Sequence, residues 1–382
     1  MKRLLPVMMV GNLLLSQTPA GIEREGAYWV QTVKAGVAAE SVHQLRVNTV
    51  GAVTLRGSTE PRVVYTLRKR VRARSEVDAA RLLGQVRVSW TMLRETGQLS
   101  VVQPLNHPAY VDVEIHVPRG LRQTIISTRG GNVSAVDLDN GIAVDSAGGL
   151  IDLDRIGGPS VAKTGGGEIR IGSVAGSLKC ISAGGSIRAL RIGGEAWLET
   201  AGGEIEVSES EGPVHASTNG GNIRVERAGA NVTASTAAGR IEVQNARGMV
   251  SAANSAGSIE VGSAQGVRCE ASGGAIRLRG ASGSLRAATD VGNILAELMA
   301  GAPLKDSLLA TGAGDVTVLI PANLALTVKA QNEGGRSARI ISEFPEIASH
   351  RLTNVLVTEG SLNGGGPVLT ISAPGTIYLR RR

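Results

Sequence analysis

Residues 130–169 read GGNVSAVDLDNGIAVDSAGGLIDLDRIGGPSVAKTGGGEI, and the Gly-Gly phrase in this stretch returns as far as Ala313-Gly314. Eleven such phrases follow one another. Their first residues lie 18 apart, except for one step of 17 and a last step of 22. A fixed period of this length indicates a solenoid, in which each repeat is one structural unit stacked on the next.

Each repeat contains two short runs of alternating apolar residues. Counting from 0 at the first Gly, apolar residues fall at positions 3 and 5 and again at positions 12 and 14, as in strands with one buried face. The glycines are expected in the turns, where they supply backbone angles that other residues resist. Position 16 is mostly Thr or Ser, so stacked coils would form a hydroxyl ladder that bonds its neighbours or the turn backbone.

The handedness of the solenoid has two alternatives. A left-handed helix of three hexapeptides would need apolar residues at positions 3, 9 and 15, but positions 9 and 15 hold residues such as Glu211 and Glu199. We therefore predict an all-β fold, a right-handed parallel β-helix of about eleven 18-residue coils. This choice agrees with the usual handedness of parallel crossovers.

The sequence around the repeats predicts four segments. Residues 1–20 form a signal peptide, and residues 21–129 form a small β-rich N-terminal domain that covers the open edge of the first coil. Residues 130–321 are the β-helix repeats. Residues 322–382 form a β-rich C-terminal cap, because a solenoid end requires a polar, non-repeating unit.

The N-terminus has the layout of a secretory signal peptide. Lys2 and Arg3 precede an apolar run from Leu4 to Leu15, and cleavage is expected after about Ala20. The run is too short to span a bilayer, and no later segment reaches that length. We expect an exported chain in the periplasm, at the cell surface or outside the cell; the alternative is a frayed cytosolic N-terminus.

The composition agrees with a thin solenoid interior. Of the 382 residues 42% are hydrophobic but only 2% are aromatic, so no conventional aromatic-rich core is expected. Cys180 and Cys269 both fall at inward position 14, five coils apart, once a one-residue deletion after Gly266 is allowed for. That is ~24 Å at strand spacing, beyond the ~7 Å limit for bridged Cα atoms. We expect two buried cysteines, not a disulfide or a metal pair.

The sequence predicts no cofactor and no metal. His107 and His116 flank one strand and are the least implausible ligand pair, but no histidine spacing matches a metal motif. The Gly-x-Gly matches lie between strands, whereas a phosphate loop leads from a strand to a helix. Nucleic-acid binding is not predicted despite the formal charge of +7, because interleaved aromatics and a helical reading element are absent.

Catalysis would require paired carboxylates on neighbouring coils. Glu204 with Glu206, or Glu242 with Glu260, could be such neighbours. The short repeats leave no room for the long loops that enclose a substrate cleft. We therefore predict that the chain is not an enzyme, and a carbohydrate-active enzyme remains the least favoured alternative.

Four arginines form the candidate binding site. Arg68, Arg70, Arg72 and Arg74 alternate with other residues on a predicted strand, which puts four guanidiniums on one face. Such a face could hold phosphates or anionic sugars. The favoured interpretation is a charged solvent face that discourages strand pairing.

The outer faces of the repeats encode no particular ligand. Position 4 carries charges of both signs, which predicts that they compensate one another. Trp197 is the only aromatic residue of the repeats, at outward position 13. It could be a contact point or an isolated surface residue.

The chain resembles the bacterial putative-adhesin family of unknown function over roughly residues 40 to 382. The resemblance is carried by the Gly-Gly-x-Ile-x-Val repeats, the segment Val113–Pro118 and the tail Leu362–Pro367. It implies an exported, non-enzymatic right-handed β-helix, adhesin-like or a structural or binding module of the cell envelope. No functional residues are carried over from it.

The partner is an unknown protein, glycan or envelope surface, and the chain is expected to be a monomer. A periplasmic accessory protein of an envelope signalling system is the alternative function.

Overall fold

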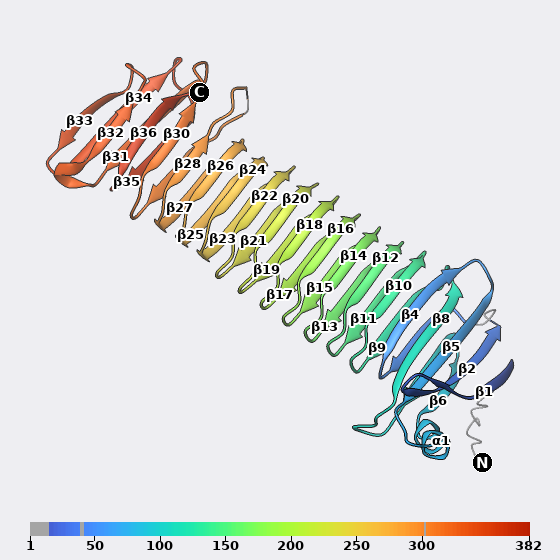
Figure 1. Cartoon of the computed structure of the whole chain (residues 1–382). Coiled ribbons are helices and arrows are strands. Elements are labelled where there is room, and N and C mark those ends of the chain that lie inside the picture. The colour runs from blue at the N-terminus through green and yellow to red at the C-terminus, as the bar shows by residue number, and fades with distance from the viewer. Residues whose placement is uncertain (1–14, 39–41, 302) are drawn as a thin grey trace, which may run out of the picture. The chain divides into compact units, whose positions relative to one another are not determined.

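The computed structural model describes residues 15–38, 42–301 and 303–382. The chain is nearly all β, with 63% of residues in strands and 3% in helices, and contains a β-solenoid of about 11 turns of roughly 18 residues. These features confirm the predicted all-β parallel solenoid. The chain divides into two compact units, residues 1–183 and 184–382, and each unit contains two sheets, named sheet A and sheet B (Figure 1).

The first unit contains the N-terminal strands and the first regular coils. Sheet A of this unit has the spatial order β1 (Leu15–Glu25), β2 (Tyr28–Ala38), β5 (Arg62–Val71), β8 (Tyr110–Pro118), β4 (Ala52–Ser58), β10 (Val133–Leu138), β12 (Ile151–Ile156) and β14 (Ile169–Val174). Sheet B has the order β6 (Arg87–Leu93), β7 (Thr96–Val102), β3 (Gln44–Thr49), β9 (Gln123–Thr128), β11 (Gly141–Ser146), β13 (Ser160–Thr164) and β15 (Leu178–Ser182).

The second unit contains the remaining coils and the C-terminal strands. Its sheet A has the order β16 (Ile187–Ile192), β18 (Ile205–Ser210), β20 (Ile223–Ala228), β22 (Ile241–Ala246), β24 (Ile259–Ala264), β26 (Ile276–Ala281), β28 (Ile294–Glu297), β30 (Val316–Ile320), β36 (Thr376–Arg381) and β32 (Arg339–Ser342). Its sheet B has the order β17 (Ala196–Thr200), β19 (Val214–Thr218), β21 (Val232–Thr236), β23 (Val250–Ala256), β25 (Val267–Gly273), β27 (Leu285–Val291), β29 (Ser307–Thr311), β35 (Val368–Ala373), β31 (Leu326–Asn332), β34 (Val355–Leu362) and β33 (Ala348–Leu352).

A regular coil contributes one strand to each sheet and buries three side chains from each. In β12 these are Ile151, Leu153 and Ile156, so two successive residues between the last two face outward. In β13 the buried positions are first, third and fifth. The two outward neighbours in sheet A bend each strand into a corner, as a bulge does. The strands are parallel and in register, so like residues stack from coil to coil.

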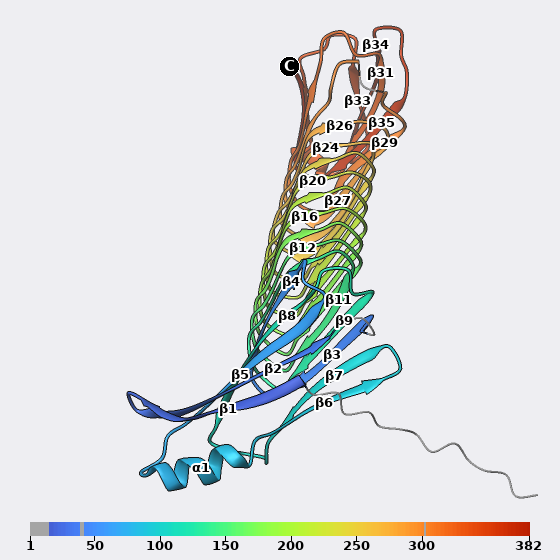
Figure 2. The same ribbon diagram turned by 90° about the vertical axis from the view of Figure 1, so that its right-hand side faces the viewer.

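The hydroxyl ladder is confirmed, and it bonds to the turn backbone. Thr164 donates its hydroxyl to the carbonyl oxygen of Gly149 in the preceding turn at 2.9 Å, and accepts from the amide of Gly167 in its own turn at 3.1 Å. Both bonds recur in the second unit at Thr200, Thr218 and Thr236. Each threonine therefore ties two adjacent glycine turns together. Figure 2 shows the strands β16, β20 and β24 of the second unit following one another.

At both ends of the chain the coils do not stack in sequence order. In the first unit the coil of β3 and β4 lies between the β7–β8 coil and the β9–β10 coil. In the second unit the coil of β35 and β36 lies between the β29–β30 coil and the β31–β32 coil (Figure 1). Antiparallel strands then extend sheet A of the first unit, with β5 beyond β8, and sheet B of the second unit, with β34 beyond β31.

Two short helical segments interrupt the strands in the part of the chain that the structure describes. The helix α1 (Glu76–Gly84) follows Ser75, whose side chain accepts a hydrogen bond from the amide of Asp78 at 3.2 Å, as an N-cap does. The acidic residues Glu76 and Asp78 in the first turn also favour a helix that starts here. A 3-10 turn spans Gly335–Ser337.

The predicted signal peptide falls mostly on residues 1–14, which lie outside the described residues. Its last part, residues 15–20, begins strand β1, which pairs with β2. Among the described residues no helix is long and apolar enough to cross a membrane. Cleavage after Ala20 and the domain boundaries remain predictions.

Candidate functional site

The four predicted arginines do not share one strand. Arg68 and Arg70 lie on β5, whereas Arg72 and Arg74 follow its end, before α1. Arg68 forms an ion pair with Glu25 of β1, and Arg70 forms one with Asp112 of β8. The guanidinium of Arg72 lies 4.8 Å from the centre of the Tyr28 ring.

At least three of these side chains therefore contact neighbouring strands of the first unit. Arg74 is exposed, and it makes no ion pair in the part of the chain that the structure describes. Binding of an anionic ligand by this set remains a prediction.

Lys69 lies on the opposite, inward face of β5, where sequence reasoning assigned it no role. Its side chain is only 7% exposed, and its ammonium donates to the carbonyl oxygens of Val86 at 2.9 Å and Leu83 at 3.4 Å. Burial lowers the pKa of Lys69. The charge lies at the C-terminal end of α1, where the helix dipole and the last carbonyls favour a cation. The sequence signal for this buried ammonium is a lysine at an inward position of a strand.

Three of the candidate carboxylates lie on the outer face of sheet A in the second unit, and Glu204 lies in the turn just before β18. Glu242 and Glu260 are register partners, as predicted. Glu242 accepts from Arg224 at 3.1 Å, and Glu260 pairs with Arg279 at 2.8 Å and also with Arg240. The remaining two carboxylates are also engaged, Glu204 by Asn222 at 3.0 Å and Glu206 by Arg188 at 3.5 Å.

The charges of both signs along this face do compensate one another. This sheet therefore presents a network of ion pairs.

The histidines and cysteines have separate surroundings. His107 contacts Gln85 at 3.1 Å, and His116 contacts Glu114 at 3.2 Å. No group of three or more His, Cys, Asp or Glu residues that could hold a metal ion occurs among the described residues. Cys180 and Cys269 are free and buried, as predicted, and burial raises the pKa of the Cys269 thiol to about 12.

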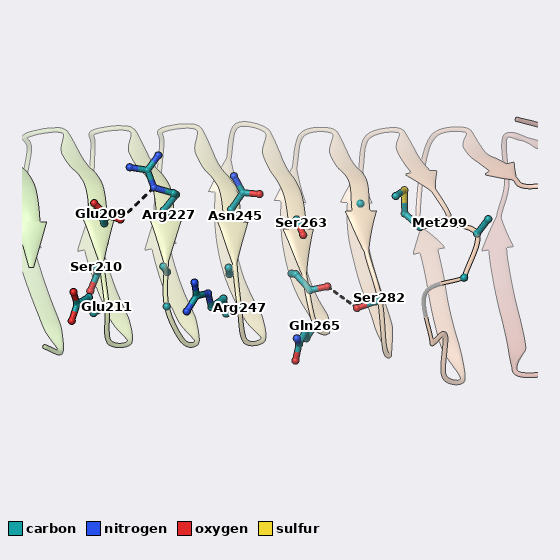
Figure 3. Close-up of a pocket in the computed structure, with 17 residues that line it drawn as sticks. Glu209, Ser210, Glu211, Arg227, Asn245, Arg247, Ser263, Gln265, Ser282 and Met299 are labelled. Carbon is teal, nitrogen blue, oxygen red and sulfur yellow. Dashed lines mark hydrogen bonds and ion pairs between the residues drawn. The ribbon is translucent and has the colours of Figure 1, made fainter. Parts of the chain in front are cut away.

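A groove of about 870 Å³ runs along the sheet A corner of the second unit (Figure 3). The second of the two outward residues of each strand and the residues just after it form its walls, beginning with Glu209 and ending with residues 299–301 after β28. Glu209 pairs with Arg227 at 3.6 Å, and the Ser282 hydroxyl donates to the Ala264 carbonyl at 3.1 Å. The groove is open and carries mixed charges, so it can hold a polar ligand only by surface contacts.

The comparisons with known proteins concern the fold. No family model and no curated protein matches the chain. A solved structure of a putative cell adhesion protein from Clostridium sporogenes is similar over 92% of this chain and 100% of that chain, at 10% identity and a TM-score of 0.21.

Two further solved structures are putative adhesins. The one from Bacteroides fragilis is 18% identical over 75% of this chain and 95% of that chain, with a TM-score of 0.22. The one from Parabacteroides merdae is 13% identical over 76% of this chain and 96% of that chain, with a TM-score of 0.24. These likenesses support no inference about a ligand.

Proposed function

We propose that the chain is an exported, non-enzymatic β-solenoid that binds a partner through its outer faces, as an adhesin-like or structural module of the cell envelope. One observation carries this proposal: the coils present flat sheet faces and open grooves whose charged groups pair with one another. Such a surface gains affinity from many weak contacts repeated along the coils, as repeat proteins commonly do.

The paired carboxylates favour binding over catalysis. A general acid and a general base need different surroundings, so that one carboxyl keeps its proton while the other loses it. Glu242 and Glu260 instead lie in similar surroundings, since both accept from arginines. An open groove also leaves a bound substrate in contact with water.

The alternative, a periplasmic accessory protein of an envelope signalling system, is favoured by a different observation. Two apolar side chains of the first unit, Val77 and Leu105, are 79% and 83% exposed. Val77 lies on α1, and the Leu105 loop approaches the end of this helix through the His107–Gln85 contact. Exposed apolar side chains near arginines are typical of a protein-binding surface.

Fractionation of the producing cell tests the proposal. We expect a mature chain that begins near Gly21 and that protease removes from intact cells, and we expect cells without it to attach less well to surfaces. A chain that keeps Met1 and stays in the cytoplasm would refute the proposal. Recovery from the periplasm together with a membrane protein would instead support the accessory function.

A further inference from the structure

The outer face of sheet B in the second unit differs in chemistry from that of sheet A. Sheet A carries Arg–Glu pairs, whereas the outward positions of four successive sheet B strands are mostly small and uncharged. From β17 to β23 these positions are Trp197, Glu199, His215, Ser217, Thr233, Ser235, Ser251 and Ala253. Among these eight positions Glu199 carries the one carboxylate, and most of the others carry hydroxyl groups.

Trp197 and His215 form an aromatic platform at one end of this face. They are register partners on β17 and β19, and their ring centres lie 5.2 Å apart with 32° between the ring planes. His215 also lies 3.4 Å from the Glu195 carboxylate. The Trp197 side chain stays 45% exposed, so the platform offers an apolar ring surface with a polar rim.

A groove of about 590 Å³ lies on the same face over the strands β19 to β27, and we name it the sheet B groove. It begins at Ser217, two residues after His215 on β19, and extends to Asp290. Ser235 donates a hydrogen bond to the Ser217 hydroxyl at 3.2 Å. The lining consists mainly of hydroxyl, amide and small side chains, and its carboxylates are Glu270 and Asp290.

Asn254 lines the sheet B groove and has an unsatisfied acceptor. It occupies the place of the ladder threonine, is 5% exposed, and donates its amide to the Gly239 carbonyl at 2.6 Å. Its Oδ1 atom is buried and has no hydrogen-bond partner among the described residues. The amide of Gly257, which would serve a threonine here, donates to the Gly273 carbonyl at 2.9 Å instead. A buried acceptor without a donor is costly, so we expect Asn254 to make this coil less stable than a ladder threonine would.

We infer that the Trp197–His215 platform and the sheet B groove bind a neutral glycan chain laid across successive coils. The inference deepens the proposed function and rests on it. Sugar C–H faces stack on an exposed indole, and sugar hydroxyls pair with hydroxyl and amide side chains. Coils ~4.8 Å apart repeat at about the length of one pyranose unit. Glu270 pairs with Arg268 at 2.9 Å, so Asp290 is the lining carboxylate that disfavours an anionic chain. The hydroxyls disfavour an apolar protein surface.

Calorimetric titration of the purified mature chain tests the inference. The probes are cellohexaose, chitohexaose, laminarihexaose and mannohexaose, with a polygalacturonate hexamer as the anionic comparison. We expect at least one neutral hexasaccharide to bind, and Trp197→Ala to weaken that binding at least tenfold. The matched control is Leu190→Ala, an exposed apolar side chain on sheet A of the same unit, which should leave affinity unchanged.

Ser235→Ala removes a hydroxyl from the lining of the sheet B groove, and its fold should be retained because alanine already occupies the partner position Ala253 on the next strand. It should weaken glycan binding several-fold without lowering the thermal midpoint. The inference is overturned if no neutral hexasaccharide binds, if the anionic hexamer binds more tightly, or if both variants bind as the parent does. A chain that is exported and supports attachment but fails this test would lose only the glycan inference.

Discussion

Each glycine turn contains two residues that look alike in sequence but experience different surroundings. A Cβ at Gly167 would lie 2.0 Å from the carbonyl oxygen of Gly149, whereas a Cβ at Gly166 meets nothing within 4 Å. The same contrast explains why later turns read Ala238-Gly239 and Ala256-Gly257. Close approach of successive turns, rather than backbone angle, requires the second glycine at Gly167.

Alanine at these two positions should therefore have opposite effects. We expect Gly167→Ala to lower the free energy of unfolding by about 1–3 kcal/mol, the usual range for overpacking. Gly166→Ala should be neutral or raise it slightly, because alanine restricts the unfolded chain. Urea unfolding followed by circular dichroism measures both. Equal losses in the two variants would contradict the explanation.

The ladder hydroxyls can be tested in the same way. Thr218 bridges the Gly203 carbonyl at 3.0 Å and the Gly221 amide at 3.2 Å. Thr218→Val keeps the shape but leaves both backbone groups without this partner, so we expect a loss of about 1–3 kcal/mol. Thr233→Val, on the outer face of β21, is the control and should change stability little. A neutral Thr218→Val would show that the ladder contributes no stability.

At the residue scale the sequence predicted much of the coil. Positions 3, 5, 12, 14 and 16 of the repeat were predicted correctly to face inward, because strand alternation identifies them. Position 8, represented by Leu138 and Ile156, was missed as a third inward position. Two outward residues precede it, so it breaks the alternation by which buried positions are recognised. The acceptor of Asn254 was also missed, because a single sequence does not show which turn amide is already occupied.

At the scale of elements, α1 is held to β5 by one buried ammonium. Burial lowers the pKa of Lys69 from its ordinary value of 10.5, so the folded chain binds this proton less readily than the unfolded chain. Between the lowered pKa and 10.5 the unfolded state therefore carries more protons, and the free energy of unfolding should rise with pH.

Lys69→Met should remove this contribution. Urea unfolding of parent and variant is measured from neutral pH up to 10.5. The free energy of unfolding of the parent should rise relative to that of the variant as the pH increases. Below the lowered pKa the difference between the two should be constant, since both states are then protonated. Lys329→Met is the control, because Lys329 is exposed and pairs with Glu359 at 3.2 Å. Parallel pH profiles for parent and Lys69→Met would refute the account.

At the scale of the whole chain, both ends combine predictable strands with an unpredictable order. The alternating runs before Thr128 and after Leu324 correctly indicated strands. The spatial order of these strands depends on which coils pair with each other. The alternation of apolar and polar residues within a strand does not specify its neighbour, so the order could not be predicted from it. Inserting an out-of-order coil makes residues distant in sequence neighbours, as when β35 separates β29 from β31. Closing such long loops costs entropy and should slow folding of the ends.

The stability of the inserted C-terminal coil should therefore determine the stability of the strands on both of its sides. Ile371 of β35 is fully buried, and Ile371→Asn should destabilise this coil by on the order of 3 kcal/mol. Because β35 pairs with β29 and β31, amide exchange should accelerate in both strands, although β29 precedes β35 by some 60 residues. Leu352→Asn on the exposed edge strand β33 should leave β29 protected. Faster exchange in β31 alone would mean that the ends unfold in sequence order, and the insertion would then have no role in closing the solenoid.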